Sequence, residues 1–511
     1  MMETTNFNKK NSTILLIALI DVAVHLLVYN NLEYMRDELL YFSIGKHPAA
    51  GFATTPPFIG ILSFILQNTV GYSLFAVRII PALGSGLMVL MTAYLAKELG
   101  GKSYAQILSA FVVLVSPFVL RTFLLYQPVF IDLLFWTLVL ILLVRFVNTN
   151  STRYLIYLGI VAGFSMLNKY LIAILFVIIL VVIAFTKHRT IYTKKELYIG
   201  LFLAFIIFLP NLVWQFANDL PVINHMSELH DTQLVYVDRF AFMIDQLMMP
   251  FFASLIIIPG LIYLLINQNM KKYRFIGIVI ILAVASLCFL RAKSYYTIGV
   301  FPFLIAAGSV WFEQKIKLQM IRYSIIPIFI LLILPILPLA LPVKKTDGMV
   351  EYFKKLETKY GIELGRKFED GTIHSLPQDY ADMIGWEELT SVTNTAVQKI
   401  EKKDRFIIFC ENYGQAGAIS VIGEKFGLPE PVCFNDAFWY WVPSSFEPDI
   451  EELIYINDEL GEDVAALFES VETIGSITNK NSREFGTSVY LCRNPKRSFN
   501  AFWKERLDMI D

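Results

Sequence analysis

Long apolar runs, repeated along the first two thirds of the chain, constrain its fold more than any other feature. A helix needs about 20 apolar residues to cross the hydrocarbon core of a bilayer, and many of the runs approach that length. Hydrophobic residues make up 56% of the 511-residue chain, and its mean hydropathy is +0.56. The sequence therefore predicts a polytopic α-helical membrane protein.

The apolar runs correspond to about eleven transmembrane helices. The expected spans are 12–30, 74–96, 104–120, 128–147, 154–168, 170–186, 197–213, 242–267, 275–290, 296–312 and 323–342. The shorter apolar stretch 57–70 is expected to lie at the membrane interface. The first run follows two lysines as in a signal peptide, but it carries Asp21 and His25 and shows no clear cleavage site. We therefore interpret it as an uncleaved first span.

Basic residues are concentrated in alternate connections between these spans, for example in 187–195 and 271–274. Short loops rich in Lys and Arg stay in the cytoplasm. The pattern therefore predicts a cytoplasmic N-terminus and, after an odd number of spans, a C-terminus on the outer side of the membrane.

The residues after Pro342 differ in character from the rest. They include 30 acidic and 19 basic residues, a net charge of −11, whereas the remainder carries +10. Strand-like runs such as RFIIFC and TSVYLC alternate with helical patterns. We therefore expect two domains, a transmembrane domain over 1–342 and a soluble extracytoplasmic α/β domain over 343–511. The acidic balance of the second domain argues against nucleic acid as a partner.

Two adjacent acids, Asp37 and Glu38, directly follow the first span in the stretch MRDELLYFSIG. Neighbouring residues on a helix point about 100° apart, so only one of the two can face a given substrate atom. If the stretch is helical, Tyr41 shares a face with Asp37. We expect one acid to serve chemistry and the other to hold the loop. The alternative is that both are solvated loop acids.

A third acid, Asp132, lies inside the apolar run PVFIDLLFW. A carboxylate within a span is costly and is normally paired or functional. We expect Asp132 to support an active site, with a purely structural ion pair to Arg121 or Arg78 as the alternative.

Four isolated bases lie at span ends that the charge rule assigns to the outer side: Arg78, Lys169, Arg291 and Lys293. Arg and Lys are the natural protein ligands for phosphate. These bases are therefore candidate ligands for an anionic substrate. The alternative for each is that the long side chain reaches outwards to lipid headgroups.

Two further features have alternatives that the sequence leaves open. His225 lies in an outer loop with Glu228 and His230, but the spacing is weak for a metal site, so we expect a polar loop that covers the active site. In the tail, Tyr413 and the aromatic run 438–441 either line an acceptor groove or serve as core or as a docking surface against the transmembrane domain. We favour the second interpretation.

Several stretches together carry a resemblance to a known family. In order they include RDELLYFSIG, TTPPFIGIL, FAVRIIPALGSG, GFSMLNKYLIAILF and KSYYTIGVFPF, and in the tail ENYGQAGAISVIGEKFGLPEP. They resemble the bacterial family 39 glycosyltransferases, the group of the dolichyl-phosphate-mannose protein mannosyltransferases and of the aminoarabinose transferase that modifies lipid A. The resemblance implies a GT-C fold and a polyprenyl-phosphate sugar donor, used on the outer face of the bacterial inner membrane.

The family's pattern also suggests roles for particular residues. It points to Asp37 as the general base and supports Lys293 as a phosphate ligand. One departure stands out, because relatives often carry Lys or His directly before the Pro-Pro pair, where this chain has Thr54 and Thr55. A hydroxyl cannot replace a cation at a phosphate, so either another base supplies the charge or the donor sits differently.

The expected function is inverting transfer of a sugar from a polyprenyl-phosphate donor to a hydroxyl of a lipid, glycan or protein acceptor. We expect catalytic roles for Asp37, Glu38 and Asp132; donor-phosphate contacts from Arg78, Lys169, Arg291 and Lys293; and substrate contacts from Tyr41, Thr55, His225, Tyr295 and Tyr296. No metal or other cofactor is expected, and membrane lipids are the remaining partner. The alternatives are a transporter or flippase for lipid-linked sugars, or a catalytically inactive family member that acts as a scaffold.

Overall fold

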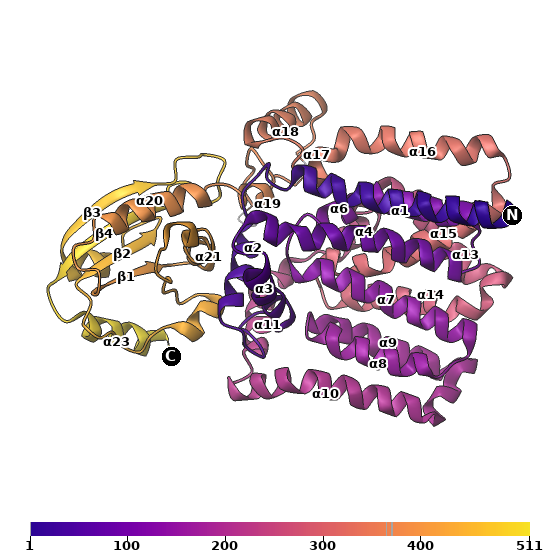
Figure 1. Cartoon of the computed structure of the whole chain (residues 1–511), viewed down its shortest axis with the longest axis horizontal. Coiled ribbons are helices and arrows are strands. Elements are labelled where there is room, and N and C mark those ends of the chain that lie inside the picture. The colour runs from indigo at the N-terminus through magenta and orange to yellow at the C-terminus, as the bar shows by residue number, and fades with distance from the viewer. Residues whose placement is uncertain (1, 364, 369–370, 511) are drawn as a thin grey trace. The chain divides into compact units, whose positions relative to one another are not determined.

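The structure is a computed structural model of the whole chain, and it describes residues 2–363, 365–368 and 371–510. Helices dominate it (Figure 1). Their bounds are α1 (Met2–Val28), α2 (Arg36–Ser43), α3 (Phe58–Thr69), α4 (Leu74–Glu98), α5 (Ser103–Leu114), α6 (Pro117–Thr122), α7 (Pro128–Thr149), α8 (Arg153–Met166), α9 (Ala173–Ala184), α10 (Lys195–Ala217), α11 (Pro221–Thr232), α12 (Arg239–Met248), α13 (Ser254–Ile266), α14 (Arg274–Phe289), α15 (Phe301–Lys315), α16 (Gln319–Ile333), α17 (Leu337–Ala340), α18 (Thr346–Tyr360), α19 (Gln378–Ala381), α20 (Trp386–Gln398), α21 (Tyr413–Val421), α22 (Glu462–Leu467) and α23 (Phe499–Ile510).

The chain packs into two compact units. The first, called the membrane unit below, holds the N-terminal helix up to Val28, residues 49–59 and residues 78–341. The second, called the sheet unit, holds residues 29–48, 60–77 and the chain from Pro342 onwards. The segments 29–48 and 60–77 are therefore grouped by packing with the C-terminal residues rather than with the spans that neighbour them in sequence.

In the described part of the chain, seven helices are long and apolar enough to cross a membrane, or up to nine if each of two bent helix pairs forms one span. The seven are Lys10–Val28, Leu74–Glu98, Pro128–Thr149, Lys195–Ala217, Gln268–Phe289, Ser294–Lys315 and Gln319–Ala340. Figure 1 shows α1, α7, α10 and α16 of the membrane unit with their axes roughly parallel. The predicted polytopic α-helical membrane protein is confirmed, whereas the count of eleven spans stays a prediction.

Glycines bring the helices of the membrane unit into close contact. A Cβ atom on Gly159 of α8 would lie 2.1 Å from the carbonyl oxygen of Gly200 on α10. A Cβ on Gly260 of α13 would lie 2.3 Å from the carbonyl oxygen of Leu304 on α15. Small residues at helix crossings let backbones approach closely, which is a common source of helix association in membranes. Glycine is therefore required at both crossings.

The sheet unit is built on one four-stranded sheet, as the α/β pattern of the tail predicts. Its strands are β1 (Phe406–Cys410), β2 (Glu452–Asn457), β3 (Phe468–Ser476) and β4 (Ser488–Pro495), in the order β1-β2-β4-β3. β1 and β2 are parallel, with Phe409 opposite Tyr455, and the other two pairings are antiparallel.

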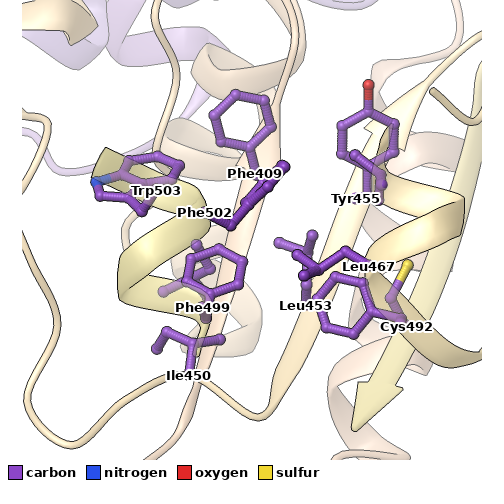
Figure 2. Close-up of a cluster of buried hydrophobic side chains, with 12 residues drawn as sticks. Phe409, Ile450, Leu453, Tyr455, Leu467, Cys492, Phe499, Phe502 and Trp503 are labelled. Atoms are coloured by element: carbon purple, nitrogen blue, oxygen red, sulfur yellow. The ribbon is translucent and has the colours of Figure 1, made fainter. Parts of the chain in front are cut away.

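Both faces of the sheet are buried along β1 and β2, where consecutive residues are buried, whereas most of β3 is exposed or half-buried. On one face, Phe409, Leu453 and Cys492 pack with Phe499 and Trp503 of α23 (Figure 2). On the other face, α20 contacts β2, β3 and β4, and α21 contacts β1. The sheet therefore holds α21, which directly follows β1, as a fixed support for α2 and the segment 29–48 around it.

Candidate functional site

Glu38 holds the beginning of α2. Its carboxylate accepts a hydrogen bond from the backbone N–H of Met35 at 2.9 Å, and the Met35 sulfur accepts one from the N–H of Asp37 at 3.1 Å. Glu38 is fully buried, whereas Asp37 on the next position is partly exposed. This reciprocal capping satisfies N–H groups that the helix itself leaves unbonded. The Glu38 carboxylate is therefore used to hold the start of α2.

The Asp37 carboxylate is held by a tyrosine from the C-terminal part of the chain. The Tyr413 hydroxyl donates a hydrogen bond to Asp37 Oδ1 at 2.9 Å. The guanidinium of Arg36 lies 4.4 Å from the centre of the Tyr413 ring. Burial and then the Asp37 charge raise the pKa of Tyr413. The phenol therefore keeps its proton and acts as a donor to the carboxylate.

Two glycines allow α2 to lie directly on α21. A Cβ on Gly417 would be 2.8 Å from the Cβ of Leu39 and 3.0 Å from its carbonyl carbon, and one on Gly414 would be 2.8 Å from the side chain of Arg36. Any larger residue at 417 would push against the α2 backbone. The small residues in the motif YGQAG thus set the distance at which Tyr413 meets Asp37.

The segment that follows α2 is also attached to the sheet unit. His47 bonds Glu430 at 2.6 Å, and its ring stacks on Trp441 with 4.1 Å between ring centres. The hydrogen bond from His47 lowers the pKa of Glu430. Lys46 pairs with Glu424. Tyr413 and Trp441 therefore serve as contacts for the segment 29–48 of their own unit, and a docking surface against the transmembrane domain stays a prediction.

A further acid, Asp382, lies beside this segment. It is 3% exposed, and its carboxylate oxygens lie 3.4 Å from the guanidinium of Arg483. Its backbone carbonyl accepts a hydrogen bond from the N–H of Arg36 at 3.1 Å. Burial raises its pKa to about 7, although Arg483 and Arg36 oppose the shift. Sequence reasoning missed this residue, because no motif marks an acid in the irregular stretch before α20.

In the membrane unit, a second cluster surrounds Lys169. Its ammonium lies 3.9 Å from the centre of the Tyr296 ring and 5.5 Å from that of Tyr295. Asp132, near the start of α7, is within electrostatic range of Lys169. The Asp132 Oδ1 atom is buried and accepts no hydrogen bond from the described residues. A buried carboxylate oxygen without a donor is costly, which makes it a candidate contact for a ligand.

Local packing explains how these residues meet. A Cβ on Gly299 would lie 2.4 Å from the ring of Trp136, so the 3₁₀ turn Ser294–Val300 lies flat on α7 one turn beyond Asp132. The side-chain amide of Asn168 donates to the carbonyl oxygen of Pro128 at 3.0 Å and fixes the Lys169 loop to the start of α7. Three segments far apart in the sequence thus converge.

The remaining expected site residues of the membrane unit lie as follows. His225 on α11 is within electrostatic range of Lys293, and burial is the main cause that lowers its pKa, so the ring is neutral at pH 7. Arg291 donates to the carbonyl oxygen of Val235. Arg78 on α4 is 2% exposed, and Thr55 is also buried.

The structure thus brings the expected site residues together in two groups. Asp37, Glu38 and Tyr41 belong to the sheet unit, and Asp132, Lys169, Tyr295 and Tyr296 form the cluster in the membrane unit. Each of the two groups lies within a single unit. Among the described residues, no group of three or more His, Cys, Asp or Glu side chains is arranged to hold a metal ion.

Comparisons with known proteins agree with the resemblance found in the sequence. Residues 54–214 match the family model of dolichyl-phosphate-mannose-protein mannosyltransferases. A search of curated proteins finds no match.

Solved structures extend the agreement over most of the chain. The crystal structure of ArnT from Cupriavidus metallidurans bound to undecaprenyl phosphate matches with a TM-score of 0.65 at 13% identity, covering 93% of this chain and 97% of ArnT. The apo state of the same protein gives 0.55 at 13% identity with the same coverage. The oligosaccharyltransferase AglB from Archaeoglobus fulgidus, in complex with an inhibitory peptide and a dolichol-phosphate, gives 0.50 at 12% identity over 87% of this chain and 69% of AglB. The chain is therefore a multi-pass membrane protein of the GT-C fold and resembles the mannosyltransferases and ArnT, glycosyltransferase-type enzymes.

Proposed function

We propose that the protein transfers a sugar from a polyprenyl-phosphate donor to an acceptor hydroxyl, with Asp37 as the general base. Asp37 takes the proton of the hydroxyl while the acceptor oxygen forms a bond to the anomeric carbon. The bond between that carbon and the phosphate oxygen breaks, and its electron pair leaves with the polyprenyl phosphate. Attack from the opposite side inverts the anomeric configuration, through an oxocarbenium-like state as in glycoside hydrolysis.

The observation that carries the proposal is the placement of the Asp37 carboxylate. It follows the first membrane helix closely, it is partly exposed, and the partly buried phenol of Tyr413 donates to one of its oxygens at 2.9 Å. A general base must be oriented before it can take a proton, and a fixed donor on one oxygen orients the carboxylate. Glu38 is committed to capping α2, so the chemistry falls to Asp37.

The cluster around Lys169 suits the leaving phosphate. Lys169 provides a point charge, and Arg78, Arg291 and Lys293 are further candidate ligands for phosphate oxygens. Asp132 would keep Lys169 in place, and Tyr295 and Tyr296 would line the donor site beside it. The polyprenyl phosphates bound to ArnT and AglB support a donor of this chemical class.

The proposed setting is the bacterial inner membrane, with the soluble domain 343–511 and Asp37 on the periplasmic or extracellular side. The distribution of Lys and Arg among the loops supports this orientation. His225, Tyr41 and Thr55 are proposed to complete the substrate-binding surface, and no cofactor takes part in the reaction.

The test is to reconstitute the purified protein into liposomes that contain a polyprenyl-phosphate donor with a radiolabelled sugar and a mixed membrane extract as acceptor. We expect the label to leave the donor and appear in a new product, with unlabelled polyprenyl phosphate released. A transporter would instead move intact donor between leaflets, and an inactive scaffold would leave the donor both uncleaved and unmoved. Either of these two results would contradict the proposal.

A further inference from the structure

A polar cavity of about 470 Å³ lies within the sheet unit, and all the residues that line it belong to that unit. Its walls come from residues 30–34 before α2, residues 72–74 at the start of α4, and several C-terminal segments that include Lys345 and Asn479. Pockets for small molecules typically occupy about 300–1,000 Å³. The volume therefore suits a small ligand or the headgroup of a larger one.

Several polar groups of this cavity are available to a ligand. Within the described residues, the side chains of Asn30, Lys345 and Thr346 make no hydrogen bond or ion pair. Asn31 donates its amide N–H to the carbonyl oxygen of Pro342 at 2.9 Å, which leaves its amide oxygen to accept. The cavity thus offers both donors and acceptors, as amide and hydroxyl side chains do.

The charges of the lining are balanced. Two acids, Glu33 and Glu387, face two bases, Lys345 and Lys425. Glu387 pairs with Lys425, and the Glu33 carboxylate accepts a hydrogen bond from the backbone N–H of Glu387 at 3.0 Å. A phosphate group would meet the Glu33 and Glu387 carboxylates as well as Lys345 and Lys425 and would make the balanced lining net negative, whereas a neutral ligand leaves the balance unchanged. Hydroxyls are neutral groups that donate and accept at once.

The place of the cavity in the chain restricts where its ligand comes from. Asn30 and Asn31 follow the span Lys10–Val28 by two and three residues, and Leu74 begins the span Leu74–Glu98. Two stretches of the lining therefore directly adjoin membrane spans in the sequence. The ring of Tyr72, 38% exposed, adds an aromatic surface at this edge.

Backbone hydrogen bonds connect the lining of the cavity to the start of α2, the helix that carries Asp37. The N–H of Glu33 donates to the carbonyl oxygen of Met383 at 3.0 Å, and the N–H of Arg36 donates to that of Asp382 at 3.1 Å. Met383 lines the cavity, and Arg36 directly precedes Asp37. The two backbone bonds run from the cavity to the start of α2.

We propose that this cavity binds sugar residues of the acceptor, so that the acceptor hydroxyl belongs to a glycan or glycolipid at the membrane surface. The inference rests on the proposed function and names its acceptor class. A neutral, hydroxyl-rich ligand fits the balanced charges, the unused amides and the exposed tyrosine ring. Free and lipid-linked glycans share this chemistry and are separated by the test.

The experiment measures binding of neutral trisaccharides to the full chain in nanodiscs by saturation-transfer NMR. The probes are mannotriose and chitotriose, a trihexosyl diacylglycerol placed in the nanodisc membrane, and glycerol 3-phosphate. We expect at least one trisaccharide, free or lipid-linked, to bind more tightly than glycerol 3-phosphate. Binding only of the lipid-linked form assigns a glycolipid, and binding of both assigns a glycan headgroup.

Substitutions connect that binding to the cavity. Thr346→Trp fills the space and is expected to weaken binding at least tenfold, and Asn30→Ala removes one amide and is expected to weaken it about threefold. Thr358→Trp, at an exposed position near the other end of the same helix α18, is the matched control and should leave binding unchanged. The inference is wrong if no trisaccharide binds, if only glycerol 3-phosphate binds, or if both cavity variants bind as the wild type does.

The Asp37→Asn variant separates this inference from the proposed function. It should bind the trisaccharide normally, because Asp37 does not line the cavity. Glycan binding by a wild-type protein that transfers no sugar would contradict the proposed function alone. Sugar transfer by a protein whose cavity binds no glycan would contradict the inference alone.

Discussion

At the scale of single residues, the hydroxyl group of Tyr413 fixes the carboxylate on which the proposed chemistry depends. The two residues are 376 positions apart in the sequence. Asp37 itself could be singled out from the sequence, because two adjacent acids that directly follow a membrane span are unusual. Tyr413 could be noticed as part of a motif, but its contact with Asp37 depends on the tertiary fold, which no local pattern encodes. The same holds for Lys169 and the tyrosine pair beside it.

The first residue-scale prediction concerns Tyr413→Phe. The change removes a hydrogen bond to a charged group, worth about 1.5–3 kcal/mol, so sugar transfer should fall about 10- to 100-fold. The hydrogen bond from Tyr413 stabilises the ionised carboxylate. Without it the carboxylate is protonated more easily, so the low-pH decline in activity should also move to higher pH. A full pH–rate profile measures both effects. Tyr490→Phe in β4 is the control, because the Tyr490 hydroxyl makes no hydrogen bond within the described residues, and it should leave the profile unchanged. A Tyr413→Phe profile identical to that of the wild type would contradict the orienting role of Tyr413.

The second concerns a buried pair in the membrane unit. The ring nitrogens of His25 lie 2.8 Å from the carbonyl oxygen of Asp21 and 3.2 Å from that of Leu120, and its Nδ1 lies 3.6 Å from the Asp21 carboxylate. The Ser85 hydroxyl oxygen lies 3.3 Å from the same Nδ1, so the ring and the Asp21 carboxyl group belong to one buried polar cluster. Asp21→Leu and His25→Leu should each destabilise the protein by about 1–3 kcal/mol, because each leaves polar atoms of the cluster unsatisfied, and the double variant by less than the sum. Denaturant unfolding in detergent measures the cycle, and additive losses would show that the two side chains do not interact.

At the scale of elements, α2 depends on α21 more than on its own sequence. The eight residues of α2 are too few to form a stable helix alone, so its position comes from packing. Most membrane helices could be located from hydropathy, because length and apolarity suffice. Their breaks could not: the expected span 104–120 is split at Ser116 between α5 and α6, and the expected span 242–267 falls in a helix pair bent by 83°. Such bends depend on tertiary packing, which hydropathy does not report.

The element-scale prediction is that Gly417→Ala separates α2 from α21. The new methyl group would meet the backbone of Leu39, which cannot move aside, at an expected cost of about 1–3 kcal/mol. A displacement of Asp37 by about 1 Å should lower transfer roughly 100-fold. Thermal unfolding and transfer rates measure the two losses. Gly348→Ala on α18 meets only the flexible side chain of Lys344 and serves as the control. Full activity of Gly417→Ala would show that this contact does not position Asp37.

At the scale of the whole molecule, the division into two packing units differs from the order of the sequence. Residues 29–48, which carry Asp37, pack with C-terminal residues that lie more than 290 positions later in the sequence. Composition reveals the boundary near residue 342, because charge and hydropathy change there. It does not reveal that loop segments between the first spans join the second unit, since their docking depends on contacts such as that of His47 with Trp441.

Asp382 gives the molecule a predicted dependence of stability on pH. Its pKa is about 7 in the folded protein against 3.8 for an ordinary aspartate, so between these values the folded state keeps a proton that the unfolded state has released. Stability therefore falls as pH rises from about 4 to 7, by up to about 4 kcal/mol. Asp382→Asn removes this titration, so its melting temperature relative to the wild type should rise between pH 5 and pH 7 and level off near pH 8. The exposed Asp404→Asn variant is the control, and a difference that does not vary with pH would contradict the role of Asp382.

The most direct measurement for the molecule as a whole is the single-turnover rate of sugar transfer by the full chain and two neighbouring variants. Asp37→Asn should slow transfer by about 10²- to 10⁴-fold, the usual contribution of a general base. Glu38→Gln should retain transfer within about tenfold and lose about 0.5–2 kcal/mol of stability, because it weakens only the cap of α2. Wild-type transfer by Asp37→Asn would contradict the assignment of Asp37 as the base.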